Sequence, residues 1–322
     1  MTRILAYRFS AFGDVAMTVP VFREFLEQNP DVEIVMVSRK NFKALFEGVP
    51  NLIFKGIDVD DYKGIFGLRR LSNELIKEFN PDLIANLHDV IRTKIIDKFY
   101  VRKGLKVFKI NKGKEEKDHL TDVWNLNKVQ LKRTVERYAD VFREMGFKVE
   151  LSQKLRPSSE YKSGIGFAPF AQHKGKMLPL EKSFELVRIL AKKHTVYFFG
   201  GGKKETEILE KWESQIPNTK SLSGKLSLTE ELSKIAELEV MISMDSANMH
   251  LASLVGTRCV SIWAATHPYA GFLGFGQSEA DVVQVKDLTC RPCSVFGDKE
   301  CYRGDWACLE EFDIQKVIEK IT

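Results

Sequence analysis

Short apolar runs alternate with stretches of helical periodicity along the whole chain. The runs predict buried strands at residues 3–7, 32–37, 83–86, 165–168, 195–199, 240–243 and 259–263. The periodic stretches predict helices at residues 15–28, 181–192, 205–214 and 247–255, with a short amphipathic helix over 310–322. Strands that alternate with helices in this way are typical of parallel sheets covered by helices on both faces.

The alternating pattern occurs twice, and the two occurrences are separated by a polar stretch. Residues 151–164 contain Pro157, Ser158 and Ser159, and they interrupt both periodicities. A chain of 322 residues is also longer than one hydrophobic core usually extends. We therefore predict two α/β domains, 1–156 and 157–322, the second including the C-terminal helix.

Composition and charge narrow the class of protein. Hydrophobic residues make up 44% of the chain and charged residues 29%, as in ordinary globular proteins. The N-terminal residues have no secretory-signal pattern, and no apolar stretch approaches the roughly 18 residues that span a bilayer. We expect a cytoplasmic protein, or one that lies on the cytoplasmic face of the inner membrane without crossing it.

The positive charge is modest overall but uneven. A net charge of +5 does not predict a nucleic-acid-binding protein. Between Arg92 and Lys117, however, ten Lys and Arg residues stand against three Asp and Glu. This stretch is either a solvated basic face or a surface for anionic lipid or a phosphorylated acceptor.

Residues 10–14, Ser-Ala-Phe-Gly-Asp, directly follow the first predicted strand. A dinucleotide-binding turn would need the spacing G-x-G-x-x-G here, and one glycine disfavours an oxidoreductase. Open α/β sheets bind ligands at the carboxyl ends of their strands, so Asp14 is a candidate general base. The alternative is that Asp14 only caps the following helix.

Two further polar segments follow strands in the second half. Residues 168–176 include Lys174 and Lys176, which could hold a pyrophosphate as point charges or could simply lie in a solvated loop. Residues 244–250, Met-Asp-Ser-Ala-Asn-Met-His, open a helix whose backbone N–H groups could face an anion. Capping by Asp245 or Ser246, and a core position for His250, are the alternatives.

Four of the five cysteines are spaced C-x2-C-x7-C-x6-C, from Cys290 through Cys293 and Cys301 to Cys308. The first pair suits a metal knuckle, and four thiolates would suit a structural zinc ion. The spacing has no second C-x2-C, so we favour free buried thiols or a redox pair.

The ordered set of motifs resembles glycosyltransferase family 9, the heptosyltransferases of lipopolysaccharide core synthesis. The opening RILAYRFSAFGDVAMTVPVFREF is similar to the N-terminal segment of the family, and GFAPFAQHKGKMLPLEKSFELV is similar to its donor loop. VMISMDSANMHLASLVGTRCVSIWAATHP is similar to its donor-binding core, and the resemblance covers nearly the whole chain.

The resemblance implies a GT-B fold, in which two Rossmann-like domains with parallel sheets face each other across a central cleft. It implies an inverting, metal-independent transferase that uses a nucleotide-sugar donor, ADP-heptose by family default, and no further cofactor. The acceptor would be a lipid-linked or core oligosaccharide, bound by the N-terminal domain. The nucleotide sugar would bind the C-terminal domain, and no nucleic acid would be involved.

By position, the resemblance makes Asp14 the catalytic base and Lys176 the contact to the donor phosphates. Asp245 would contact the transferred sugar, and the backbone of Ser246, Ala247 and Asn248 would meet the pyrophosphate. His250 completes the donor motif. Arg92 and Lys94, after a predicted strand end, are candidate contacts to an acceptor phosphate.

The chain departs from the family pattern at three places. Ala247 replaces a glycine, Leu178 replaces a tryptophan, and residues 263–266 read Trp-Ala-Ala-Thr instead of Phe-Gly-Pro-Thr. The departures bear on the identity of the donor. They also leave two other hypotheses open, a non-catalytic sugar-nucleotide-binding protein of a surface-polysaccharide assembly complex and a sugar-nucleotide epimerase.

Overall fold

The computed structural model describes residues 1–321, and they form two compact units. Unit 1 contains residues 1–112 and 134–152, and unit 2 contains residues 113–133 and the chain from 153 onward. The sequence predicted two continuous domains that meet after residue 156, and the structure differs by assigning 113–133 to unit 2. Contacts within unit 2 explain this: the Lys117 ammonium lies 4.4 Å from the Phe272 ring centroid, and Leu131 N–H donates to the Tyr269 carbonyl (2.9 Å).

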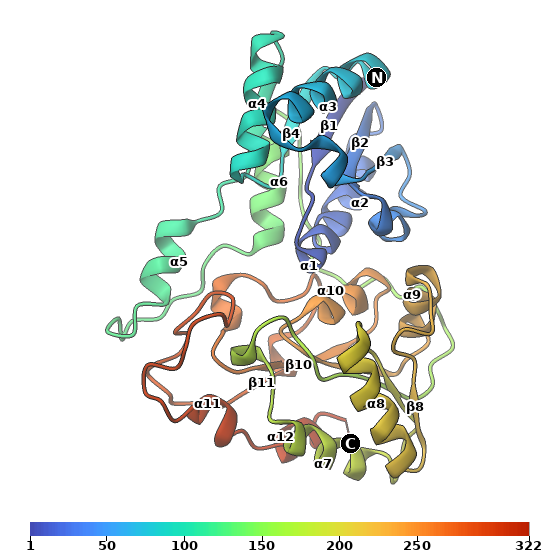
Figure 1. Cartoon of the computed structure of the whole chain (residues 1–322), viewed down its shortest axis with the longest axis vertical. Coiled ribbons are helices and arrows are strands. Elements are labelled where there is room, and N and C mark those ends of the chain that lie inside the picture. Colours follow the sequence, from blue (N-terminus) through green and yellow to red (C-terminus); the bar gives the residue numbers. More distant parts are fainter. Residues whose placement is uncertain (322) are drawn as a thin grey trace. The chain divides into compact units, whose positions relative to one another are not determined.

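Unit 1 is built on a five-stranded sheet in the order β3-β2-β1-β4-β5 (Figure 1). Its strands are β1 (Thr2–Tyr7), β2 (Val32–Arg39), β3 (Leu52–Ile57), β4 (Leu83–Asn86) and β5 (Lys106–Lys109). Every neighbouring pair is parallel. The two strands that the sequence did not predict, β3 and β5, are the two edges of the sheet.

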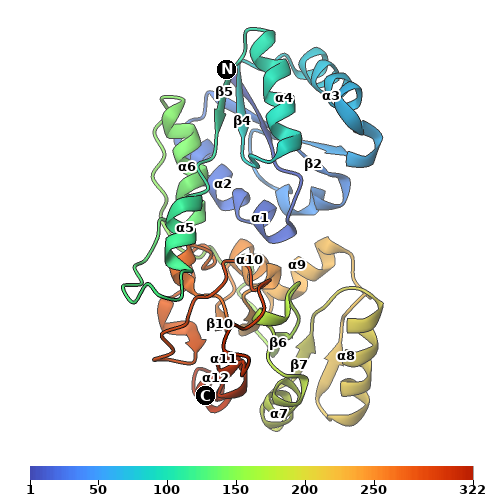
Figure 2. The same ribbon diagram turned by 60° about the vertical axis from the view of Figure 1, so that its left-hand side comes forward.

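Helices cover both faces of this sheet (Figure 2). They are α1 (Phe12–Ala16), α2 (Thr18–Gln28), α3 (Gly64–Phe79), α4 (Ile91–Arg102) and α6 (Thr134–Glu144), with 3-10 turns at Lys40–Phe46 and Val59–Tyr62. Helices α3 and α4 share one core with β1 and β2, while α2 and α6 pack together through Phe25 stacked on Phe142 (4.5 Å). The single helix predicted over 15–28 is divided at Met17, and Pro20 lies in the first turn of α2, where a missing N–H costs no intrahelical bond.

Unit 2 repeats the architecture with six parallel strands in the order β11-β10-β9-β6-β7-β8. Its strands are β6 (Ile165–Ala168), β7 (Val196–Phe198), β8 (Thr219–Ser221), β9 (Val240–Met244), β10 (Cys259–Trp263) and β11 (Val282–Gln284). Both edge strands, β8 and β11, were again not predicted.

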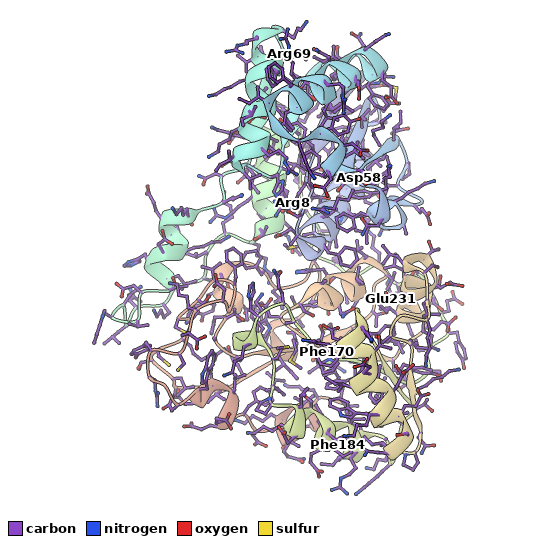
Figure 3. All side chains as sticks on the ribbon, in the orientation of Figure 1. Arg8, Asp58, Arg69, Phe170, Phe184 and Glu231 are labelled. Carbon is purple, nitrogen blue, oxygen red and sulfur yellow. The ribbon has the colours of Figure 1, made fainter. Side chains whose placement is uncertain are left out.

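Unit 2 contains seven of the described helices. They are α5 (Lys114–Leu120), α7 (Leu180–Leu190), α8 (Lys203–Gln215), α9 (Leu228–Ala236), α10 (Ala247–Leu254), α11 (Ala307–Glu310) and α12 (Gln315–Ile318). Helices α7, α8 and α12 share the main core, where Phe184, labelled in Figure 3, meets the Trp212 ring edge-on at 5.8 Å. The helix predicted over 310–322 is only the single turn α12, and Thr322 lies outside the described residues.

The strand order places the candidate residues at equivalent points of the two sheets. In its own strand sequence the unit 1 sheet has the order 3-2-1-4-5 and the unit 2 sheet the order 3-2-1-4-5-6, and each reverses direction between the first and fourth strands. Ligands of open α/β sheets bind outside the carboxyl ends of strands at such a reversal. These ends are β1 and β4 in unit 1, and β6 and β9 in unit 2.

Candidate active site

Asp14 lies just beyond the end of β1, in the short helix α1. Its Oδ2 is 2.7 Å from Arg8 Nη2 and accepts a hydrogen bond from Ala11 N–H at 3.3 Å. The second contact is a capping interaction, so the capping alternative is part of what Asp14 does. Both contacts use Oδ2, and 23% of the side chain stays accessible. The carboxylate is therefore held in one orientation, and Oδ1 is in neither contact.

Arg8 is the residue that orients this carboxylate. It is buried, donates from Nη1 to the Leu87 carbonyl (2.6 Å), and lies 5.6 Å from the centroid of the Tyr138 ring. Tyr138 in turn donates its hydroxyl to the Asp14 carbonyl at 3.3 Å. Figure 3 marks Arg8 within unit 1. The guanidinium of Arg8 thus connects the segment that follows β1 with the segment that follows β4.

His88 follows β4 and faces the segment after β1. Its Nδ1 is 3.5 Å from the Phe9 backbone N–H, and its Nε2 is 3.3 Å from Ser10 Oγ. Burial, together with the nearby Arg8 and Lys112 charges, lowers the pKa of His88 to about 3, so the ring is neutral at physiological pH. If Nδ1 accepts the backbone proton, Nε2–H donates to Ser10 and leaves the Ser10 hydroxyl proton available to another acceptor.

A pocket of about 620 Å³ opens beside His88 in unit 1. Both candidate acceptor contacts, Arg92 and Lys94, line it, together with Phe9, Ser10, Arg39, His88, Asp89, Val90 and Ile91. Arg92 and Lys94 lie in the first turn of α4, where free backbone N–H groups add positive potential. Lys94 Nζ lies 3.6 Å from Asp89 Oδ1, so the charge of Lys94 is already paired with a carboxylate. Arg39 and Arg92 are the other two cationic side chains that line the pocket.

In unit 2, the structure brings Lys176 and Asp245 together from two strand ends. Lys176 ends the 3-10 turn Lys174–Lys176 after β6, and Asp245 directly follows β9. Lys176 Nζ is 2.9 Å from Asp245 Oδ2, with 16% and 4% of the side chains exposed. Lys174 instead lies over the Trp306 ring at 4.7 Å, so Lys176 is the lysine at the strand ends.

Helix α10 begins immediately after Asp245. Ser246 occupies the N-cap position but makes no side-chain capping bond, and its Oγ lies 3.2 Å from Ser243 Oγ. Ser246, Ala247 and Asn248 are partly exposed, whereas His250 is buried one turn further along. The first turn of α10 is therefore accessible to a ligand, and His250 lies in the interior as its core alternative predicted.

Two of the departures from the family pattern lie in the interior of unit 2. Leu178 is 2% exposed and belongs to the hydrophobic core, and Trp263 is fully buried. That these departures bear on the identity of the donor stays a prediction. Both residues act on the packing beneath the loops.

The cysteines of the C-terminal segment are free thiols. Cys290 and Cys308 are buried, and Cys293 and Cys301 are half-buried. Burial and the neighbouring cysteines raise the pKa of Cys293, and burial raises that of Cys308 to about 12. Within residues 1–321, no three His, Cys, Asp or Glu side chains are grouped so as to hold a metal ion.

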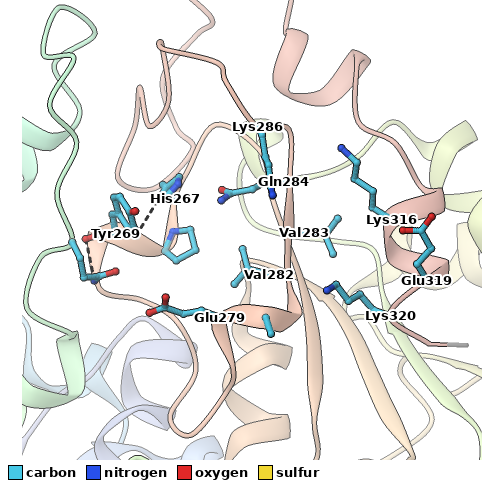
Figure 4. A pocket seen from close by; sticks show the side chains of 13 residues that line it. His267, Tyr269, Glu279, Val282, Val283, Gln284, Lys286, Lys316, Glu319 and Lys320 are labelled. Atoms are coloured by element: carbon cyan, nitrogen blue, oxygen red, sulfur yellow. Dashed lines mark hydrogen bonds between the residues drawn. The ribbon is translucent and has the colours of Figure 1, made fainter.

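A second pocket, of about 580 Å³, lies beside the edge strand β11 (Figure 4). Lys286, Lys316 and Lys320 line it, and Tyr269 N–H donates to His267 Nδ1 at 3.1 Å. Burial lowers the pKa of His267 to about 4. None of the predicted site residues lines this pocket, and it borders the edge of the sheet rather than the strand reversal.

Several residues that contact the predicted ones or line the unit 1 pocket beside them were not predicted from the sequence. Arg8, Arg39, His88 and Tyr138 in unit 1, and Gly175 in unit 2, are of this kind. Arg8 and His88 could have been found, because each comes within two residues of a strand that ends at the reversal point. Tyr138 could not, because it is 124 residues from its partner Asp14.

Solved structures of bacterial heptosyltransferases superpose on the whole of this chain. The chain superposes on E. coli ADP-heptose lps heptosyltransferase II with a TM-score of 0.72, 19% identity and coverage of 100% of this chain and 97% of that one. For E. coli heptosyltransferase WaaC with ADP-2-deoxy-2-fluoro heptose the TM-score is 0.70, with 15% identity and full coverage of both chains. The fold is therefore GT-B, the two-unit α/β class of glycosyltransferases.

Sequence comparison is more specific. Residues 111–302 match the model of glycosyltransferase family 9 (heptosyltransferase). The chain is 25% identical over 317 residues to lipooligosaccharide heptosyltransferase 2 of Campylobacter jejuni subsp. jejuni serotype O:2, covering 96% of this chain and 93% of that protein. It is also 24% identical over 284 residues to lipopolysaccharide core heptosyltransferase OpsX of Haemophilus influenzae, covering 81% and 78%. The chain belongs to glycosyltransferase family 9 and is a glycosyltransferase.

The helices of residues 1–321 also bear on membrane topology. None combines the length and the apolar character that crossing a bilayer requires.

Proposed function

We propose that this glycosyltransferase transfers a heptose from ADP-heptose to a sugar hydroxyl of a lipopolysaccharide or lipooligosaccharide core, with inversion at the anomeric carbon. Unit 2 binds the donor and unit 1 binds the acceptor. The observation that carries the proposal is the Lys176–Asp245 pair beside the accessible first turn of α10.

The donor diphosphate sits where positive groups converge. Lys176 supplies a full charge, and the N–H groups of Ala247 and Asn248 supply the positive end of the α10 dipole. Breaking the bond between sugar and diphosphate puts negative charge on the leaving phosphate oxygen. Cationic and N–H groups already in place stabilise that charge without reorganising, which allows the reaction to proceed without a metal ion. Asp245 accepts hydrogen bonds from hydroxyls of the transferred sugar when Lys176 turns to the phosphate.

Asp14 acts as the general base on the acceptor. The attacking hydroxyl oxygen forms a bond to the anomeric carbon, and its proton passes to Asp14. The Arg8 fork and the Ala11 N–H hold Oδ2, so the free Oδ1 is the atom that takes the proton. Ser10, oriented by His88, lines the pocket that Arg92 and Lys94 also line, and it can accept or donate a hydrogen bond to a neighbouring hydroxyl.

The acceptor carries an anionic group that the pocket of unit 1 recognises. Arg92 and Arg39 line this pocket with positive charge, and Lys94, which is paired with Asp89, adds a third cation. Phe9 and Ile91 provide its apolar lining. Charge reversal at Arg92 should therefore raise the apparent KM for the acceptor roughly tenfold, the effect of about 1.4 kcal/mol, with donor binding unchanged. Lys43→Glu is the matched control, because Lys43 is an exposed cation of unit 1 that does not line the pocket.

A basic, exposed surface at the C-terminal end of α4 and the start of β5 binds the enzyme to an anionic bilayer. Lys98, Arg102, Lys103 and Lys106 are exposed there, beside the exposed apolar side chain of Val101. Each such cation near an anionic leaflet contributes about 1 kcal/mol, and salt screens it. Sedimentation with anionic but not neutral vesicles, lost at high salt and in a Lys98→Glu/Arg102→Glu variant, is the expected result. Equal sedimentation with both vesicle types would rule out this role.

The first experiment is a thermal-shift series with ADP-, GDP-, UDP- and CMP-sugars on the wild type and on Lys176→Ala. A ligand at 100 times its Kd stabilises the folded state by about 2.7 kcal/mol. We expect stabilisation by ADP-heptose, lost in the variant. Stabilisation by another nucleotide sugar would change the donor, and stabilisation by none would favour a non-catalytic protein.

A turnover assay with a truncated core acceptor completes the test. NMR of the product should show the anomeric configuration opposite to that of the donor, and chelators should leave the rate unchanged. Release of an epimerised sugar without acceptor would support the epimerase alternative, because an epimerase needs no acceptor hydroxyl.

A further inference from the structure

The segment of residues 291–298 packs against the loop that carries Lys176. Gly175 N–H donates to the Gly297 carbonyl at 3.2 Å, and Ala265 N–H donates to the Gly175 carbonyl at 2.8 Å. Cys293 N–H donates to the Ala265 carbonyl at 3.2 Å and closes the set. Three segments distant in sequence, the loop after β6, the loop after β10 and residues 291–298, are thereby joined through their backbones.

Gly297 touches the side chain of Lys176 itself. Its φ of +73° is in the region that favours glycine, and a Cβ added there would lie 2.8 Å from Lys176 Cγ. Gly175 is similarly close, because its Cβ would lie 2.7 Å from the Gly297 carbonyl oxygen. Backbone, without side chains, therefore lies along the aliphatic stem of the lysine, and the stem cannot move toward it.

Ser294 holds Gly297 in this place. Its side chain is fully buried, and its Oγ donates to Asp298 Oδ1 at 2.6 Å. The same oxygen accepts from the N–H groups of Phe296 (3.2 Å), Gly297 (2.8 Å) and Asp298 (3.3 Å). One hydroxyl thus organises the whole turn, and the bond to it lowers the pKa of Asp298.

Arg291 anchors the start of the same segment. It is buried and donates to the carbonyls of Thr266 (2.8 Å) and Val285 (2.7 Å), and it also bonds the carbonyl of Ala264. A buried guanidinium shared among backbone carbonyls fixes the loop after β10, on which Cys293 and Gly175 both rest. Burial lowers the pKa of Arg291 to about 10, which leaves it charged at neutral pH.

We infer that residues 291–298 form a brace that positions the Lys176 ammonium, and that Ser294 and Gly297 are positioning residues of the transferase. Neither touches the donor in this arrangement; each acts by fixing the stem whose ammonium meets Asp245 at 2.9 Å. The mechanical part, that residues 291–298 hold the Lys176 ammonium in place, follows from the contacts of Ser294, Gly297 and Gly175. Its consequence for the rate rests on the proposed function of Lys176.

The mechanical part is tested by the reactivity of Lys176. Brief acylation with an amine-specific reagent, read out by peptide mass spectrometry on the full chain, measures how often the ammonium leaves its ion pair. Ser294→Ala and Gly297→Ala should raise the labelling rate of Lys176 severalfold. Lys225, ion-paired on the surface of the same unit, is the internal reference, and exposed Ser278→Ala is the matched control variant. Unchanged labelling of Lys176 in both brace variants would overturn the inference whatever the activity.

The catalytic part is tested by a double-mutant cycle. Ser294→Ala should lower kcat by tenfold to on the order of a hundredfold, because small misplacements of a catalytic group cost that much. In a Lys176→Ala background the same change should cost almost nothing further, since the brace acts through that side chain. Losses that multiply in both backgrounds would show a general structural role and refute positioning.

A conservative and a non-conservative substitution of Asp298 test whether its hydrogen bond with Ser294 supports the brace. Asp298→Asn keeps an oxygen that accepts from Ser294 and should retain most of kcat, whereas Asp298→Ala should resemble Ser294→Ala. Should Lys176→Ala itself leave kcat unchanged while labelling rises in the brace variants, the proposed role of Lys176 fails and the brace remains. The two failures are therefore distinguishable.

Discussion

Each unit carries one carboxylate paired with one cation just beyond a central strand. Asp14 keeps 23% of its side chain exposed, whereas Asp245 keeps 4%. Removing one partner of a well-buried pair leaves an uncompensated charge and costs stability, but this matters less where water reaches the group. Lys176→Ala is therefore expected to lower the melting temperature as well as the rate, and Lys176→Arg, which keeps the charge, separates the two effects.

Asp14 gives the simplest prediction at the residue scale. Asp14→Asn keeps the size of the side chain and removes the base, so kcat should fall by about 10²- to 10⁴-fold. Donor affinity should not change, because the donor binds unit 2. Transfer assays and donor titration on the same preparation measure both quantities. Asp31→Asn, an exposed aspartate of unit 1, serves as control, and a kcat within twofold of wild type for Asp14→Asn would exclude the general base role.

His88 gives a prediction about pH. Its pKa is about 3 in the folded protein, below the ordinary value of about 6.5 expected in the unfolded chain. Between these values the unfolded state binds a proton that the folded state does not, so stability falls as the pH drops below about 6.5. From about pH 7.5 to about pH 5.5, this group alone should remove about 1.4 kcal/mol from the free energy of unfolding.

Urea unfolding of the wild type and His88→Gln at both pH values measures the contribution of His88. The variant cannot take up the proton, so its stability should depend less on pH by that amount. His267 remains in both proteins and contributes equally to each. Identical pH dependence in the two proteins would mean that His88 takes up its proton as readily in the folded state as in the unfolded chain.

At the scale of elements, burial decides which strands the sequence reveals. Strands β6, β9 and β10 are buried at every residue, so they read as continuous apolar runs. The edge strands β5, Lys106–Lys109, and β8, Thr219–Ser221, are only partly buried, and β5 mixes lysine with apolar residues whereas β8 has no apolar residue. Edge strands are specified by pairing with a neighbour, and a neighbour is not visible in a local pattern.

Helices α9 and α10 differ in how their first turns are satisfied. Ser227 caps α9 by accepting from Glu230 N–H, and Glu230 bonds back to Ser227, whereas Ser246 makes no such bond on α10. The difference leaves the start of α10 for a ligand. It also yields a matched pair of substitutions.

Ser227→Ala should lower the free energy of unfolding by about 1 kcal/mol, with donor affinity unchanged. Ser246→Ala should change stability little, because no capping bond is lost. Urea unfolding and donor titration of the two variants measure these effects. Equal destabilisation by both would indicate that Ser246 caps α10 in solution.

For the whole molecule, the division into two units predicts where donor binding is felt. Binding shifts opening equilibria only in the part that holds the ligand, unless the units are coupled. Hydrogen exchange with saturating ADP-sugar should slow in residues 168–176 and at the start of α10. Residues 1–112 should exchange as before. Slowing confined to residues 1–112 would mean that unit 1, and not unit 2, binds the donor.

The repeated α/β architecture, the central strands and the positions of Asp14, Lys176 and Asp245 after strands were predictable from the amino-acid sequence. Those features follow from local patterns: two-sided burial makes apolar runs, and polar residues after such runs lie at the ligand-binding edge. The folded structure was needed to show that Arg8 orients Asp14, that Lys176 contacts Asp245, and that residues 113–133 belong to unit 2. It also decided that Leu178 and His250 lie in the interior and that Ser294 and Gly297 support Lys176. These relations join residues that are distant in sequence, and a periodic pattern records which face of an element is buried but not which residue it meets.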